Sequence, residues 1–156
     1  MPVETPEEAS TFIRKWMEDS KVFKSESSND AFYFQYDGNV AGEIEFSIQQ
    51  PKELVRVIGV LSRMAIDPEH LEKLSAVDEK TREKVFADIA EYLIFLPPNF
   101  AFEPTPGNPK SIFFVKEITY DELTEGRLNA AMNQICRGLI FTSNKLTEKL
   151  GELATE

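Results

Sequence analysis

The residue types that build most catalytic and metal sites are scarce in this chain of 156 residues. It has one cysteine, Cys136, so no disulfide can form within a molecule. It has one histidine, His70, which excludes a zinc site built on several imidazoles. No serine or cysteine near His70 in the sequence is placed to act as a nucleophile, and we expect His70 to face solvent near the start of a helix. The sequence also has no glycine-rich motif for phosphate binding. We therefore expect no catalytic site, no metal site and no cofactor.

Long apolar runs and an excess of positive charge are also missing. The longest uninterrupted apolar run, Tyr92–Leu96, is far shorter than the roughly 20 residues that a membrane-spanning helix needs. The net charge is −10, which repels phosphate backbones and anionic membrane surfaces. With a single cysteine and no apolar segment after Met1, the sequence predicts a cytoplasmic protein that binds neither nucleic acid nor membranes.

Apolar side chains, in contrast, are plentiful. They make up 42% of the residues and include 12 phenylalanines, which is enough to drive folding around a core. The length falls in the usual range of one domain, and we find no repeat or low-complexity tract that would divide the chain. The sequence therefore predicts a single α+β domain over residues 1–156.

Three stretches have apolar residues at helical spacing: about Thr5–Ser20, Asp78 to about Leu96 after a short first piece at Asp67, and Asp121 to about Leu150. Thr5 can cap the first stretch, and Pro6 suits the first position of a helix. The last stretch is long and carries its apolar residues in a narrow stripe, which predicts an amphipathic C-terminal helix.

Six runs read as strands: Val22-Phe23, Phe32–Tyr36, Glu43–Ile48, Leu54–Leu61, Phe100–Glu103 and Ile112–Thr119. Asp37-Gly38 predicts a two-residue hairpin turn between the second and third runs. Leu54–Leu61 is apolar on both sides, as in a central strand. Because short turns join consecutive strands, we expect an antiparallel meander sheet packed with three helices.

Glu43 and Glu45 alternate with apolar residues on one of these strands. Two carboxylates on one face resemble the acid pair of a glycosidase. Charge at every second position is, however, typical of the solvent-facing side of a strand. We therefore interpret the two acids as surface residues.

Some apolar residues lie outside the expected core. On the last helix, Leu123 and Phe141 lie opposite the apolar stripe, with Arg137 between them. On the second helix, Tyr92 and Phe95 extend the apolar surface past the buried stripe. We predict that these five residues contribute to the interface of a homodimer. The alternative is that they pack against the chain's own first helix or against the proline-rich loop Pro104–Pro109.

The aromatic residues of the strands leave two alternatives open. They are Phe32, Phe34, Tyr36, Phe46, Phe113 and Phe114. They either pack the core or line a pocket for a small molecule.

The order helix, strand meander, helix, strand pair and long helix covers nearly the whole chain. It resembles the fold of type III secretion chaperones and related domains, including archaeal and bacterial families of unknown function. The resemblance implies a small, acidic, dimeric protein that wraps segments of a client around its surface, and it assigns no functional residues. We therefore expect a non-enzymatic, chaperone-like homodimer that binds a protein partner or client. The alternative is a small-molecule-binding domain with an aromatic-lined cavity.

Overall fold

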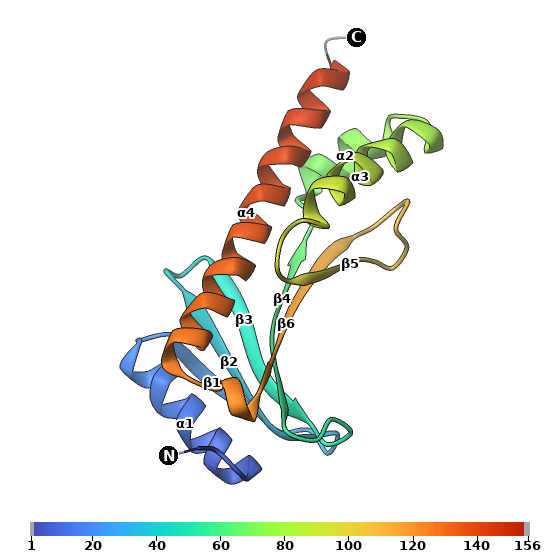
Figure 1. Cartoon of the computed structure of the whole chain (residues 1–156). Coiled ribbons are helices and arrows are strands. Elements are labelled where there is room, and N and C mark those ends of the chain that lie inside the picture. The colour runs from blue at the N-terminus through green and yellow to red at the C-terminus, as the bar shows by residue number, and fades with distance from the viewer. Residues whose placement is uncertain (1, 155–156) are drawn as a thin grey trace. The chain divides into compact units, whose positions relative to one another are not determined.

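The computed structural model describes residues 2–154 (Figure 1). Its elements in chain order are α1 (Pro6–Asp19), β1 (Phe23–Ser27), β2 (Phe32–Val40), β3 (Ile44–Pro51), β4 (Val57–Ala65), α2 (Pro68–Ser75), α3 (Glu79–Leu93), β5 (Asn99–Glu103), β6 (Ser111–Thr119), a single 3₁₀ turn η1 (Tyr120–Glu122) and α4 (Glu125–Ala154). The predicted α+β class is confirmed, but the described residues form four α-helices rather than three. The short piece at Asp67 is a helix of its own, α2.

The six strands form one antiparallel sheet in the order β1-β2-β3-β4-β6-β5. Strands β1 to β4 form the expected meander, in which each strand pairs antiparallel with the next. The prediction of a central strand is also confirmed, since β4 lies between β3 and β6. Ile58, Gly59 and Val60 are consecutive and all buried, as a strand that is covered on both faces requires.

The hairpin between β2 and β3 exists, but its predicted turn is wrong. Asp37 and Gly38 lie inside β2 and pair with β3. The chain turns instead at residues 41–43, where Ala41 and Gly42 have φ angles of 55° and 74°. Gly38 is needed for close packing, because a Cβ there would lie 2.5 Å from the ring of Phe46.

The strand predicted at Leu54–Leu61 begins later, at Val57. Leu54 and Val55 lie in the preceding turn, where their exposed fractions are 41% and 79%. Arg56 closes this turn with a φ of 60°. Because the next few residues are apolar too, composition alone did not mark where the strand starts.

The last helix also begins later than predicted. Thr119 makes no capping hydrogen bond with its side chain. The hydroxyl of Thr124 accepts from the backbone N–H of Arg127 at 3.1 Å, which caps α4. The helix then continues through 30 residues.

The chain forms two compact units. The first unit comprises Met1–Ser62 and Val115–Asn133, and the second comprises Arg63–Phe114 and Gln134–Glu156. Strands β4 and β6 and helix α4 contribute residues to both units. A single domain over the whole chain stays a prediction.

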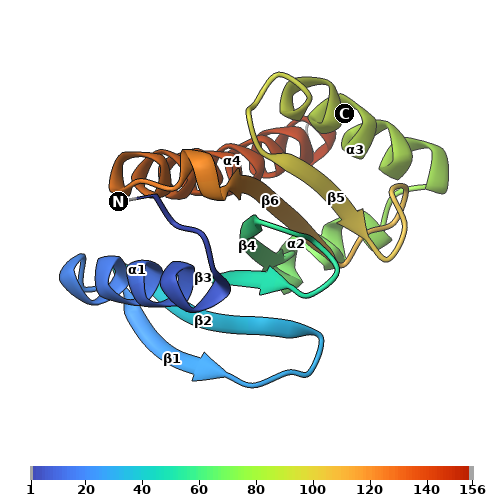
Figure 2. The ribbon, with the colours of Figure 1, turned by 60° about the horizontal axis from the view of Figure 1, so that its bottom comes forward.

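In the first unit, α1 lies along β1 and β2 (Figure 2). The start of α1 is as predicted: Thr5 and Glu8 form a capping box, and Pro6 is the first helical residue. The helix buries Ile13 and Met17 completely, so its apolar face is part of the core. In the second unit, α3 packs on β5 through the rings of Phe86 and Phe102, whose centroids lie 5.4 Å apart.

Candidate functional site

The strongest candidate for a contact surface lies at the C-terminal end of α3 and on the part of α4 beside it. The ring centroids of Tyr92 and Phe141 lie 5.8 Å apart. The Nζ atom of Lys145 lies 4.9 Å from the Tyr92 ring centroid and 5.9 Å from that of Phe141. These distances allow cation–π attraction, which holds the two helices together at this point.

The turn after α3 adds exposed apolar side chains. Ile94 and Phe95 have exposed fractions of 71% and 87%. Their backbone is nevertheless held, because the N–H of Ile94 donates to Ala90 at 3.0 Å and that of Phe95 to Tyr92 at 3.2 Å. A hydrogen-bonded turn therefore carries these exposed side chains. We call Tyr92, Ile94, Phe95 and Phe141 the α3-end surface.

The five predicted interface residues do not all behave as expected. Tyr92, Phe95 and Phe141 lie on the α3-end surface, and Arg137 is exposed on α4, one helical turn before Phe141. The prediction for Leu123 needs correction, because this residue lies before α4 begins and not on the outer side of the helix. Its side chain is only 8% exposed, so it adds no excess apolar surface. An interface role for these residues stays a prediction.

His70 lies in a setting that the sequence did not indicate. Its Nε2 atom lies 3.2 Å from the hydroxyl oxygen of Thr147 on α4. It is half-buried and lines a cavity of about 340 Å³, with Met64, Ala65, Ile66, Asp67, Pro68, Ser143 and Leu146. His70 lies in the first turn of α2, as expected, but its contact with α4 was not expected. The partner residues on α4 are too distant in sequence for any local pattern to indicate this contact.

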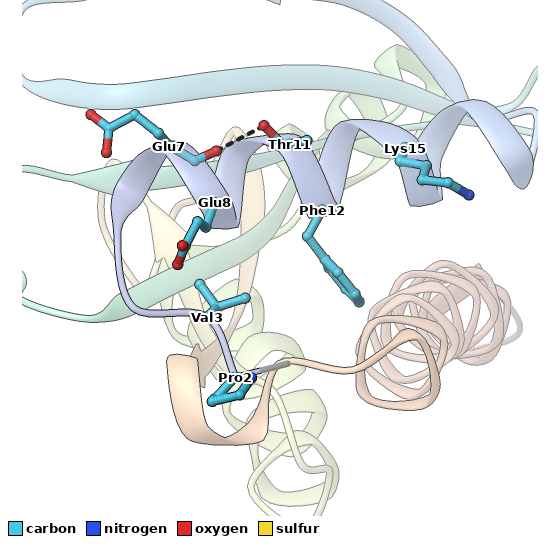
Figure 3. Close-up of a pocket in the computed structure, with 7 residues that line it drawn as sticks. All are labelled: Pro2, Val3, Glu7, Glu8, Thr11, Phe12 and Lys15. Carbon is cyan, nitrogen blue, oxygen red and sulfur yellow. Dashed lines mark hydrogen bonds between the residues drawn. The ribbon is translucent and has the colours of Figure 1, made fainter.

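A second cavity of about 500 Å³ lies beside α1 (Figure 3). It is lined by Pro2, Val3, Glu7, Glu8, Thr11, Phe12 and Lys15, and Phe12 projects from the helix on the side of Pro2. Several polar groups here already have partners. Glu8 accepts from the backbone N–H of Thr5 at 3.2 Å, and Lys15 forms an ion pair with Asp19 at 2.6 Å. They stabilise α1 and do not converge on a ligand.

The remaining polar candidates have structural surroundings. Glu43 lies in the turn before β3 and not on the strand, and Glu45 forms an ion pair with Lys24 at 2.7 Å. Burial raises the pKa of the Cys136 thiol, which lowers the fraction of reactive thiolate. Within residues 2–154, no group of three or more His, Cys, Asp or Glu side chains is placed to hold a metal ion.

The strand aromatics favour the core alternative. Phe34, Tyr36, Phe46 and Phe114 are buried. The rings of Phe34 and Tyr36 stack with their centroids 5.3 Å apart.

None of the helices in the described part of the chain is long and apolar enough to span a membrane. No curated protein matches the sequence.

Solved structures share this fold. An uncharacterized protein from Methanothermobacter thermautotrophicus is similar with a TM-score of 0.84 and 19% identity, over 91% of this chain and 99% of that one. The ExsC–ExsE complex contains a chain with a TM-score of 0.62 and 9% identity, over 92% and 97%. The Yersinia pestis type III secretion chaperone SycH, in complex with a fragment of YscM2, has a TM-score of 0.53 and 8% identity, over 85% and 98%.

The similarity to SycH confirms the resemblance to secretion chaperones at the level of the fold. The family model described as an uncharacterized conserved protein, DUF2299, matches residues 9–146, and the chain belongs to this family.

Proposed function

We propose that this protein is a non-enzymatic, chaperone-like domain that binds a protein partner or client and acts as a cytoplasmic homodimer. We place the α3-end surface in the contact between the two copies. The observation that carries this proposal is the exposure of Phe95, 87%, on a turn whose backbone is held by hydrogen bonds. Apolar side chains that gather on one exposed surface mark interaction sites in soluble proteins.

A second copy of the chain fits this surface by its chemistry. In a two-fold contact the same surface meets itself, so apolar rings meet apolar rings. The cationic side chains of Lys145 and Arg137 lie on the same part of α4, and cations bind favourably against aromatic faces. Burying one phenylalanine contributes about 1.5–3 kcal/mol per copy, offset by the cost of ordering the interface.

The similar structures support the protein-binding part of the proposal. The solved structure of SycH is a complex with a fragment of another protein, and ExsC was solved with ExsE. These complexes support the idea that proteins with this fold can bind other proteins. The alternative of an aromatic-lined ligand cavity has less support, because most of the strand aromatics pack the core.

Light scattering on the full chain tests the dimer. We expect the wild type to have about twice the chain mass of 17.8 kDa at micromolar concentration. Phe95→Glu places a charge in the contact and should give a monomer, because an unpaired buried charge costs several kcal/mol. Val55→Glu is the matched control, since Val55 is 79% exposed and belongs to the first unit.

Two outcomes would overturn the proposal in different ways. A wild type that stays at the chain mass removes the homodimer. A Phe95→Glu variant that remains dimeric, like Val55→Glu, removes the α3-end surface from the contact. Circular dichroism on both variants checks that folding is unchanged, which we expect because both side chains are exposed.

A further inference from the structure

The cavity beside His70 is formed where three elements of the second unit meet. The end of β4 supplies Met64 and Ala65, the first residues of α2 and its cap supply the polar groups, and α4 supplies Ser143 and Leu146. Its volume of about 340 Å³ falls in the range of about 300–1,000 Å³ found for ligand pockets. Ile66 is 3% exposed and Leu146 2%, so these two lining residues are part of the core, whereas Ala65 and Pro68 are exposed.

The hydrogen bonds of Thr147 favour a proton on the Nε2 atom of His70. The Thr147 hydroxyl donates its proton to the backbone oxygen of Ser143 at 3.0 Å. Its oxygen can then only accept, so the Nε2 atom of His70, 3.2 Å away, is the donor. In a neutral imidazole this leaves the lone pair on Nδ1. Nδ1 of this lining residue is then the ring nitrogen that can accept a hydrogen bond.

Asp67 supplies a second acceptor and a negative charge. Its Oδ1 atom accepts from the backbone N–H of Glu69 at 2.8 Å and caps α2. Its other carboxylate oxygen is left to accept a further hydrogen bond. Because Asp67 already occupies the helix N-terminus, an acidic ligand here would face an existing negative charge. The Ser143 hydroxyl adds a third acceptor to the lining.

We propose that this cavity binds a small molecule with a primary ammonium group on an apolar body. An ammonium group has three donors and a positive charge, which match three acceptors, one of them the Asp67 carboxylate. The apolar body would pack chiefly on Met64, Ala65 and Pro68, because Ile66 and Leu146 expose little surface. This site shares no residue with the α3-end surface, so it does not depend on the proposed dimer.

The single histidine provides a direct reporter. Because His70 is the only histidine of the chain, all imidazole signals in an NMR spectrum of the full protein belong to it. The probes are hexylammonium, hexanol and hexanoate, which share an apolar body and differ in the polar group. In mildly alkaline buffer we expect hexylammonium to shift the His70 signals saturably, with an affinity at least about tenfold above that of hexanol. Hexanoate should bind more weakly than hexanol.

A pair of capping aspartates supplies matched variants. Asp67→Asn removes the charge but keeps the helix cap, because asparagine caps helices as well as aspartate does. It should reduce hexylammonium affinity to that of hexanol. Asp78→Asn makes the same change at the cap of α3, outside the cavity, and should leave the affinity unchanged.

The outcomes are decisive in both directions. Selective binding of hexylammonium that is lost only in Asp67→Asn supports the site. The proposal is overturned by no shift at His70, by equal or tighter binding of hexanol or hexanoate, or by equal losses in the two variants. A monomeric wild type in light scattering would leave this result untouched, so the two proposals fail independently.

Discussion

The two compact units differ in where their polar side chains find hydrogen-bond partners. In the first unit several of these groups bond to one another across neighbouring segments. Gln50 is only 1% exposed, and its side-chain oxygen accepts from the hydroxyl of Tyr120 at 2.7 Å. Asp37 accepts from the hydroxyls of Ser27 and Ser47 on the two neighbouring strands. Such a network satisfies buried polar groups and pins the strand register.

The second unit instead carries the groups on which the two proposals rest. Phe95 and Ile94 are exposed at the end of α3, and His70 lines a cavity with Ser143. The first unit exposes Val55 as well, which is why that residue serves as the control for the dimer test. We infer that the first unit is mainly scaffold. Substitutions there should change stability, and substitutions in the second unit should change binding.

The largest difference between the units is expected from two glycines. A Cβ on Gly38 would lie 2.5 Å from the Phe46 ring and 2.7 Å from the backbone oxygen of Val22. Gly38→Ala therefore overpacks the first unit and should lower the free energy of unfolding by about 1–3 kcal/mol. Gly151 of α4 has nothing within 4 Å of an added Cβ. Gly151→Ala should raise the free energy of unfolding by up to about 1 kcal/mol through helix propensity.

Urea unfolding followed by circular dichroism measures both changes. Equal stability of Gly38→Ala and wild type would mean that β2 and β3 do not approach as closely as described. A destabilised Gly151→Ala would mean that another surface covers α4 at this point.

A smaller difference in the free energy of unfolding is expected when one tyrosine in each unit is replaced by phenylalanine. Tyr120→Phe removes the donor to Gln50 and leaves a buried amide oxygen without a hydrogen bond. This should cost about 1–3 kcal/mol. Tyr92 is half exposed, so Tyr92→Phe should change the free energy of unfolding by less than about 0.5 kcal/mol. The reverse order, again measured in urea, would contradict the division into scaffold and binding unit.

Helix starts were predictable from the sequence because capping is local. Thr5, Asp67 and Asp78 each accept from a backbone N–H two or three residues further on. The last helix was placed too early because its cap, Thr124, follows other residues that can cap. The misplaced start then made Leu123 look like part of an outward helix face.

The features that the sequence did not predict correctly depend on residues that are distant in the chain. Gly38 reads as a turn residue, but it is required by Phe46 on the neighbouring strand. The surroundings of His70 depend on Thr147, which lies 77 positions away. The contact of Tyr92 with Phe141 was different, because each residue already stood outside the apolar stripe of its own helix. Patterns within one element can reveal surplus surface, but not what covers it.

The smallest expected difference between the units is in how the pH dependence of stability changes when one aspartate in each unit is replaced. Burial alone raises the pKa of Asp37, but hydrogen bonds from Ser27, Ser47 and Gln35 outweigh it and leave the pKa below its ordinary value. In the second unit, the pKa of Asp88 is lowered chiefly by its bond with Lys84 at 2.9 Å. In both cases the unfolded chain takes up the proton more readily than the folded one. The contribution of each carboxylate to the free energy of unfolding is therefore present above the ordinary pKa of an aspartate, and it is lost as the pH falls through the lowered pKa of the folded state.

Salt separates the two aspartates. The neutral donors around Asp37 do not depend on ionic strength, whereas the ion pairs of the partly exposed Asp88 with Lys84 and Lys149 are screened by salt. Urea unfolding between about pH 5 and about pH 2 should show that Asp37→Asn flattens the fall in stability at low and at high salt. Asp88→Asn should flatten it only at low salt. If high salt abolishes the Asp37 effect as well, its pKa is set by charge from Lys24 and not by the hydroxyl network, and the contrast between the units weakens.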